Sequence, residues 1–126
     1  MKETFQNFVD ICKKSKELCP WSKKQDTKRF TEEMIGEANE VLDAISTGNN
    51  DHIKEELGDV LIDWVHACLS AKIDIKEIIT DAKAKIERRK PFLAEDRQVT
   101  LEEAKNFWAK AKEDERTQDE KSINFR

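Results

Sequence analysis

Apolar residues recur every three or four positions along most of the chain, which is the spacing of one face of an α-helix. The repeat predicts five helices, over residues of about 3–17, 27–47, 50–71, 74–90 and from 100 onward. The chain has only three Gly and two Pro and no Tyr, which argues against a many-turned β architecture. The predicted fold class is therefore all-α.

Short polar side chains mark where the predicted helices begin and end. Asp26 or Thr27 can cap the second helix, and the segment "TGNN" at 47–50 ends it. "TLEE", which starts at Thr100, has the Thr and third-position Glu of a capping box and predicts the start of the fifth helix. Pro91 ends the fourth helix, because a residue before proline is disfavoured in the helical conformation.

Three segments lie outside this pattern. The segment "LCPWSKKQDT" at 18–27 is predicted to form a polar loop around one Pro-Trp pair, and residues 92–99 a connector. Residues 113–126 are mostly charged with little to bury, which predicts a frayed or disordered tail. A chain of 126 residues fits one domain, which we assign to residues 1–112.

The second and third helices each carry an acidic edge beside an apolar face. The apolar face of the second comprises Phe30, Met34, Ala38, Val41, Leu42 and Ile45. That of the third comprises Ile53, Leu57, Val60, Leu61, Trp64 and Cys68. The acidic edges comprise Glu33, Glu37 and Glu40 on the second helix and Glu56, Asp63 and, slightly further round, Asp59 on the third. The short connection predicts an antiparallel hairpin in which the two edges face each other.

These acidic edges require an explanation, because like charges one turn apart weaken a helix. Carboxylates that converge beside a buried surface destabilise it unless a cation neutralises them. Mg²⁺ takes carboxylate oxygens and commonly shares its coordination sphere with substrate phosphates, and Mn²⁺ is the alternative ion. The other interpretation is a pair of solvated helix faces, because 27 acidic residues in 126 produce many Glu pairs at helical spacing by chance.

The net charge limits the classes of binding partner, and the cysteines indicate the redox state of the protein. Basic residues number 23 and acidic residues 27, giving a net charge of −4, so neither nucleic acid nor an anionic membrane is expected as a partner. Cys12, Cys19 and Cys68 follow no metal-finger spacing. Because the sequence shows no signal peptide and no long apolar run, we expect reduced thiols in a cytoplasmic protein.

Two stretches of the acidic helices, "EANEVLDAI" and "EELGDVL", carry a resemblance to a known family. The sequence resembles the MazG-type all-α nucleoside triphosphate pyrophosphohydrolases, whose signature is Glu-Glu-x-x-Glu followed after a spacer by Glu-x-x-Asp. The likeness covers residues of about 18–112, including "CPWSKKQ", "KIERRKP" and the spacing from Trp108 to Lys112. It implies Mg²⁺-dependent hydrolysis of a (deoxy)nucleoside triphosphate to a monophosphate and pyrophosphate. It also implies a hairpin core that dimerisation completes into a four-helix bundle, as a homodimer or homotetramer.

The resemblance also assigns roles to individual residues. The metal ligands that it implies, which also act in catalysis, are Glu37, Glu40, Glu56 and Asp59. The first Glu of the family's pair is Gly36 here, and Glu33, one turn earlier on the same edge, is our candidate to replace it as the residue that orients water. Ser22 is a second departure, because the family loop usually has Asp there.

Basic residues in the last turn of the fourth helix are the candidates for phosphate binding. Lys85 and Arg89 lie one turn apart near the border of its apolar face, and Arg88 points further out. Such residues also favour the helix dipole, which alone explains many basic clusters. With the resemblance, we predict that they bind phosphate. Trp108 matches a Trp near the base in similar proteins, and it either stacks on the nucleotide base or packs in the core.

Other functions stay open at this point. A di-iron bundle needs Glu-x-x-His on two helices, whereas the chain has only Asp63-x-x-His66, so His66 is expected to be a satisfied or exposed helix residue. The absent carboxylate at Gly36 keeps a catalytically impaired nucleotide-binding or helical interaction module in view. Within the enzyme class, dUTPase-like and phosphoribosyl-ATP pyrophosphohydrolase relatives share this arrangement of carboxylates.

Overall fold

The structure is a computed structural model that describes residues 1–124, with side chains described through Lys121. It contains six α-helices and one 3-10 helix and no strand among the residues described, so the all-α prediction is confirmed. The chain forms two compact units, Met1–Ile75 and Lys76–Arg126, each of which is described by itself. Within the described part, every helix is too short or too polar to cross a lipid bilayer.

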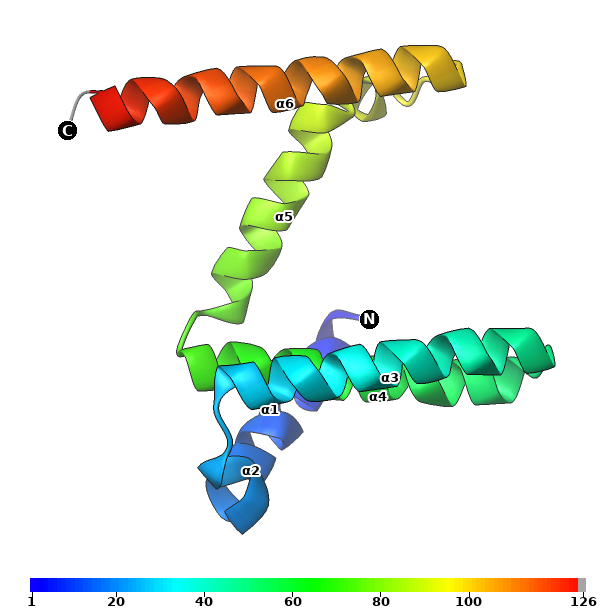
Figure 1. Cartoon of the computed structure of the whole chain (residues 1–126), viewed down its shortest axis with the longest axis vertical. Helices are drawn as coiled ribbons and strands as arrows, with labels where there is room; N and C mark the ends of the chain where they lie inside the picture. The colour runs from blue at the N-terminus through cyan, green and yellow to red at the C-terminus, as the bar shows by residue number, and fades with distance from the viewer. Residues whose placement is uncertain (125–126) are drawn as a thin grey trace. The chain divides into compact units, whose positions relative to one another are not determined.

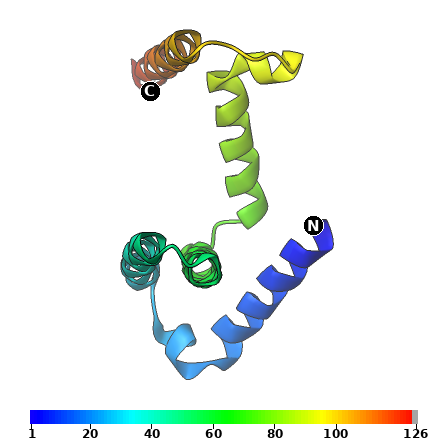
Figure 2. The same ribbon diagram turned by 90° about the vertical axis from the view of Figure 1, so that its right-hand side faces the viewer.

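The first unit is built around an antiparallel hairpin of α3 (Thr27–Thr47) and α4 (Asn50–Ala71), which lie side by side in Figure 1 and Figure 2. The Asp26 side chain caps α3, as the sequence predicts. Gly48 ends α3 with a φ of 70°, a conformation that glycine adopts without steric cost. Asn49 caps α4, so the chain reverses within the "TGNN" segment.

The apolar core of this unit lies between α1 (Lys2–Leu18) and α4. Val9 and Cys12 of α1 pack with Val65 of α4, whose side chain is completely buried. Trp64 packs against the same cluster, in agreement with its predicted place on the apolar face of this helix. Burial of these side chains removes apolar surface from water and holds α1 on the hairpin.

His66 lies beside this core and is 5% exposed. Its Nδ1 atom lies 2.8 Å from the carbonyl oxygen of Ile62, and its Nε2 atom lies 3.1 Å from Oγ of Ser15. The ring also stacks at a tilt on Phe30, with 5.0 Å between ring centroids. Both ring nitrogens therefore have partners, which confirms the expectation of a satisfied histidine.

The segment predicted to be a polar loop forms a short helix, α2 (Pro20–Lys24), so this part of the prediction was wrong. Proline suits the first position of a helix, where its missing N–H is not needed. Lys16 of α1 donates hydrogen bonds from Nζ to the carbonyl oxygens of Ser22 and Gln25, both at 2.7 Å. Ser22 is buried in this network, and a small hydroxyl fits there. These tertiary contacts hold α2 in place, and local residue preferences do not reveal them.

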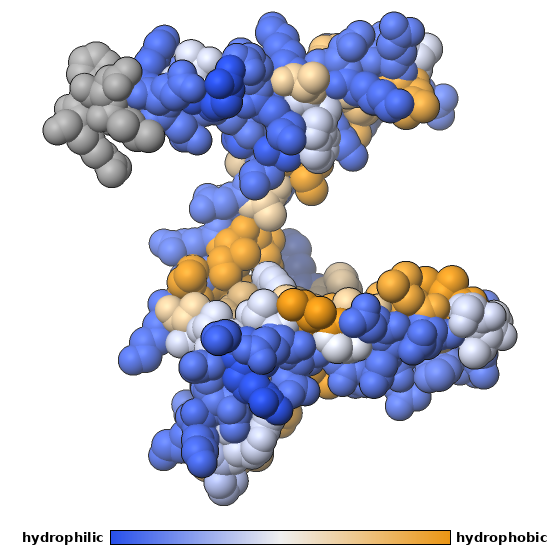
Figure 3. Space-filling view, viewed as in Figure 1, coloured by the Kyte–Doolittle hydropathy of each residue, from blue (hydrophilic) through white to orange (hydrophobic). Residues whose placement is uncertain are grey.

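The two helices of the hairpin pack through a mixed seam, which contains part of each apolar face and part of each acidic edge. Phe30 and Ala44 of α3 are 2% and 0% exposed. By contrast, Leu42 and Ile45, which the sequence places on the buried face, are 65% and 54% exposed. Leu57 of α4 is 54% exposed in the same way. Apolar side chains therefore gather on the surface of the hairpin (Figure 3), and the expectation that a second copy completes the core stays a prediction.

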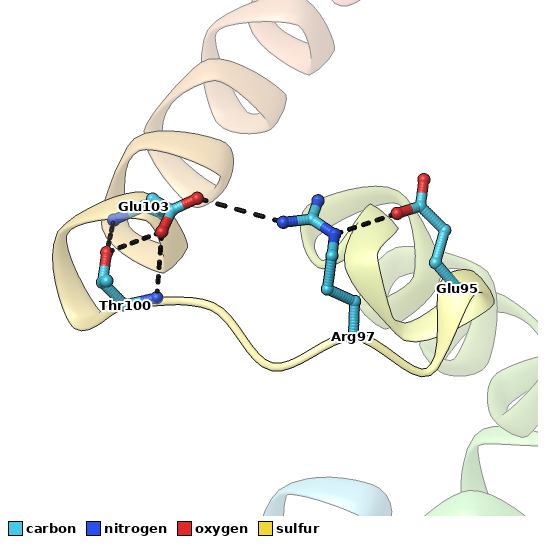
Figure 4. Close-up of polar contacts among 4 residues, drawn as sticks. All are labelled: Glu95, Arg97, Thr100 and Glu103. Atoms are coloured by element: carbon cyan, nitrogen blue, oxygen red, sulfur yellow. Dashed lines mark hydrogen bonds and ion pairs between the residues drawn. The ribbon is translucent and has the colours of Figure 1, made fainter.

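The second unit comprises α5 (Ile75–Arg89), the 3-10 helix η1 (Pro91–Glu95) and α6 (Leu101–Asn124). The capping box predicted at the start of α6 is present (Figure 4). The Oγ1 atom of Thr100 accepts a hydrogen bond from the backbone N–H of Glu103 at 3.1 Å. In return, the Glu103 carboxylate accepts from the backbone N–H and the hydroxyl of Thr100 at 3.2 and 3.0 Å.

Helix α6 continues through residues 113–124, where the composition predicts a frayed or disordered tail. Arg116 forms ion pairs with Glu113 and Glu120, which lie about one turn to either side. Such pairs stabilise an exposed helix by about 0.2–0.5 kcal/mol each, an effect that composition alone does not reveal. Residues 125 and 126 lie outside the described residues, and the boundary between a domain at 1–112 and a tail stays a prediction.

Candidate active site

Three carboxylates from the two hairpin helices converge across their seam. Glu37 lies on α3, and Glu56 and Asp59 lie three residues apart on the facing edge of α4. One carboxylate oxygen of each residue lies within 4.8 Å of the corresponding oxygens of the other two. The structure thus brings together three of the four residues of the predicted acidic set, and it confirms that the acidic edges face each other.

Burial raises the pKa values of the glutamates in this cluster. One oxygen each of Glu37 and Glu56 is buried without a hydrogen-bond partner. Burial, followed by interactions with Glu40 and Asp59, raises the pKa of Glu37 to about 7. Burial is also the largest cause that raises the pKa of Glu56, again with Glu40 as the main charged neighbour. The seam therefore concentrates negative charge in a place where water solvates it poorly.

Glu40, the fourth predicted ligand, lies beside the cluster and not within it. Its side chain is exposed, and the shared hydrogen bonds of Glu37 and Glu56 with it help raise the pKa of both.

Glu33 lies one turn from Glu37 on the same edge of α3, half-buried, and pairs with Arg29 at 2.8 Å. Its charge is also felt across the seam, because it contributes to the raised pKa of Asp63, for which burial is the largest cause. Glu33 and Asp63 therefore form an acidic continuation of the cluster. Glu33, the predicted replacement for the carboxylate missing at Gly36, thus lies on the edge of α3 that carries Glu37. Its role in catalysis stays a prediction.

His52 is a neighbour of the cluster that the sequence analysis did not identify. Its Nε2 atom lies 3.3 Å from a carboxylate oxygen of Glu56, one turn further along α4. The four-residue spacing was a readable signal, since residues four apart on a helix lie over one another.

The cluster fits a hard divalent cation. All of its donors are carboxylate oxygens, which Mg²⁺ and Mn²⁺ accept. Two of these oxygens are buried and unpartnered, and like-charged neighbours help to raise the pKa of both Glu37 and Glu56. A cation bound between the three carboxylates would supply positive charge at this point.

The predicted phosphate-binding residues lie in the second unit, at the end of α5 and against α6. Arg88 and Arg89 both pair with Glu115, the closest contacts being 2.7 Å and 2.9 Å. Lys85 lines a surface depression together with Arg88 and acidic residues of α6. Glu115 falls in the segment that the sequence analysis assigned to the tail, and no local pattern marks it.

Trp108 of α6 is 38% exposed and contacts Arg89. The guanidinium carbon of Arg89 lies 4.7 Å from the centroid of the indole ring, and Nζ of Lys90 lies 5.9 Å from it. Cations over an aromatic face are attracted by its electron density. The basic residues and Trp108 thus form one cluster, although the contact with a nucleotide base stays a prediction.

A helical hairpin with carboxylates clustered across its seam defines an all-α protein with an acidic centre. Residues 25–94, more than half of the chain, match the model of the MazG nucleotide pyrophosphohydrolase domain, and the chain belongs to this family.

Relatives with assigned names support this membership. The chain is 36% identical over 105 residues to the nucleoside triphosphate pyrophosphohydrolase/pyrophosphatase MazG of Thermotoga maritima, covering 76% of this chain and 41% of that protein. It is 32% identical over 105 residues to the nucleoside triphosphate pyrophosphohydrolase of Escherichia coli, covering 79% and 40%. A crystal structure of a mazG-related protein from Thermotoga maritima matches with a TM-score of 0.80 at 29% identity, over 86% of this chain and 98% of that one. The chain thus spans less than half of the two named enzymes.

The raised pKa of Glu37 predicts how the stability of the metal-free protein depends on pH. The folded state binds the Glu37 proton more tightly than the unfolded state, so this group's stabilisation is complete below its unfolded pKa of 4.5 and is lost as the pH rises through about 7. Urea unfolding in EDTA is expected to show this loss, and Glu37→Gln to reduce it. Glu55→Gln, at an exposed position of α4, is the matched control and keeps the wild-type slope. An unchanged slope in Glu37→Gln contradicts the assignment.

Proposed function

We propose that this chain is a Mg²⁺-dependent nucleoside triphosphate pyrophosphohydrolase, which converts (deoxy)nucleoside triphosphates to monophosphates and pyrophosphate. The observation that carries the proposal is the convergence of Glu37, Glu56 and Asp59 within 4.8 Å, with buried and unpartnered oxygens. Membership of the family and the names of two relatives support the same reaction. Mn²⁺ is the alternative ion, and the cytoplasmic location stays a prediction.

The residues that would hold the metal are Glu37, Glu40, Glu56 and Asp59. When bound, Mg²⁺ lowers the pKa of a coordinated water and neutralises charge on the triphosphate. Glu33, which lies one turn from Glu37 on the same edge of α3 and pairs with Arg29, orients the attacking water and accepts its proton. The water oxygen forms a bond to phosphorus, and the bond that breaks lies in the bridge between the α- and β-phosphoryl groups. Attack at either phosphorus gives the same products.

Lys85, Arg88 and Arg89 bind phosphate oxygens in this proposal. Arginine offers a planar fork of N–H donors that suits phosphate, and lysine offers a compact positive charge. Trp108 supplies a flat surface for the nucleotide base, and such stacking is tolerant of base identity. Because stacking does not select a base, the preference for base and sugar has to be measured with a panel of triphosphates.

A second candidate function follows from Gly36, which stands where the family usually has a Glu. No side chain other than those of its chain neighbours lies within 4 Å of the position that a Cβ would take there, so no neighbouring group replaces this carboxylate at the same point. A chain that lacks this group can bind a nucleotide without cleaving it, as a catalytically impaired binding or helical interaction module. The same panel separates this function, as well as dUTPase-like and phosphoribosyl-ATP pyrophosphohydrolase activities, from the main proposal.

We also propose that two copies of the hairpin associate as a homodimer, or within a homotetramer, to complete a four-helix bundle. The hairpin exposes large apolar side chains, among them Ile35, Leu42, Ile45, Leu57 and Leu61. Isolated exposed apolar residues are ordinary, but several on one hairpin mark an interaction surface. A second copy offers a surface of the same kind.

Pyrophosphate release from a panel of canonical and modified triphosphates tests the main proposal. Release is expected with Mg²⁺ and not with EDTA, and Glu56→Gln and Asp59→Asn are expected to reduce it about 100-fold or more, because each removes a metal ligand. Circular dichroism is expected to show wild-type helicity in both. Glu55→Gln is the matched control and retains activity. Near-normal release by both variants would remove the metal assignment, and no release from any triphosphate would favour the binding module.

Glu33→Gln tests the replacement of the carboxylate missing at Gly36. We expect kcat to fall about 100-fold, the usual contribution of a positioned general base, while Mg²⁺ binding measured by calorimetry stays close to wild type. Glu32→Gln, on the exposed side of the same helix, is the control. Wild-type turnover in Glu33→Gln would exclude a role for this residue in activating water.

Light scattering coupled to gel filtration tests the association. The wild-type chain is expected to elute at twice or four times its own mass, and Leu42→Glu and Leu57→Glu to shift it toward the monomer, because a charge cannot be buried in an apolar interface. Ile11→Glu places the same charge on the exposed side of α1 and is the control. A monomeric wild-type protein would overturn the proposed bundle.

A further inference from the structure

The carboxylate of Glu115 joins two arginines that lie next to each other at the end of α5. Its Oε1 atom lies 2.7 Å from Nε of Arg88 and 3.3 Å from Nε of Arg89. Its Oε2 atom accepts a hydrogen bond from the terminal Nη2 of Arg89 at 2.9 Å. Glu115 therefore occupies the Nε–Nη2 edge of Arg89 with both oxygens and also takes the Nε donor of Arg88.

Arg89 is held on a second side as well. Its guanidinium carbon lies 4.7 Å from the ring centroid of Trp108, so the indole covers one face while Glu115 covers one edge. The side chains of Arg89 and Glu115 are only 16% and 22% exposed, so this pair is less screened by water than a surface ion pair. The two arginines lower the pKa of Glu115 to about 2, and the carboxylate stays charged across the working pH range.

The surroundings of the pair are more acidic than a phosphate site requires. The surface depression beside it is lined by Lys85 and Arg88 on one side and by Asp114, Glu115 and Asp119 of α6 on the other. Three carboxylates thus face two cations. A phosphate chain that approached this depression would meet repulsion as well as attraction.

A carboxylate and a phosphoryl group use the same fork of a guanidinium. We propose that Glu115 is an internal competitor for substrate phosphate, which occupies Arg88 and Arg89 in the unliganded chain and is displaced when a polyphosphate binds. This inference rests on the proposed function, in which the two arginines bind phosphate. It makes Glu115 a residue that sets substrate affinity from outside the acidic cluster.

The competition has a measurable signature. The apparent affinity for any ligand of the two arginines is reduced by the fraction of chains in which Glu115 leaves them free. That fraction does not depend on the ligand, so removal of the competitor strengthens the binding of different phosphate ligands by the same factor. Tripolyphosphate and pyrophosphate are suitable probes, because they carry the phosphate chain without a base or sugar.

Isothermal titration of the full chain with tripolyphosphate and with pyrophosphate, in EDTA, tests the proposal independently of hydrolysis. Glu115→Gln is expected to tighten the binding of both about fivefold or more, because fivefold corresponds to the strongest exposed ion pairs and this pair is less exposed. Asp119→Asn removes the same charge from the same depression without touching an arginine ion pair, and it is expected to have a much smaller effect. Adding Arg89→Gln to Glu115→Gln is expected to abolish the gain.

Several outcomes overturn the proposal. Weaker binding in Glu115→Gln would show that Glu115 positions the arginines for phosphate, and equal tightening in Asp119→Asn would reduce the effect to general charge. No binding in any variant would show that the arginines take no phosphate. Circular dichroism checks that each variant keeps its helices. Pyrophosphate release with Mg²⁺ is measured separately, so failure of this inference is distinguishable from failure of the proposed hydrolysis.

Discussion

The convergence of like charges across the α3–α4 seam is the constraint on which the first unit depends. One carboxylate oxygen each of Glu37, Glu56 and Asp59 lies within 4.8 Å of the other two, and burial raises the pKa of the two glutamates. A hairpin optimised for stability alone would turn its apolar faces inward and leave the acids in water. This chain instead buries part of its acidic edges beside apolar side chains such as Phe30 and Ala44, which fits the proposed cation site.

The burial of acidic side chains between α3 and α4 leaves apolar side chains on the surface of the hairpin. Turning the acidic edges inward leaves part of each apolar face outward, at Leu42 and Ile45 on α3 and at Leu57 on α4. The proposed association of two copies covers this surface. In that arrangement the acidic centre and the apolar interface have one cause. A helix that is rotated to turn its acidic edge inward necessarily turns part of its apolar face outward.

Charge is organised differently in the second unit. There the acids and bases pair within the chain, and Glu115 satisfies Arg88 and Arg89 while Trp108 covers one of them. The first unit keeps one buried oxygen each of Glu37 and Glu56 without a hydrogen-bond partner, whereas in the second unit Arg88 and Arg89 are already paired.

The sequence by itself determined the five longer helices, the caps at Asp26 and Thr100 and the residues that could form the acidic centre, because periodicity and capping are local. The capping box at Thr100 and the chain reversal at Gly48 were both readable in this way. Only the tertiary structure decided which edge of each helix is buried, that residues 20–24 form a helix, and that Glu115 reaches two arginines. Those outcomes depend on contacts between residues far apart in the chain, such as the 26 positions that separate Arg89 from Glu115, and no local pattern encodes them.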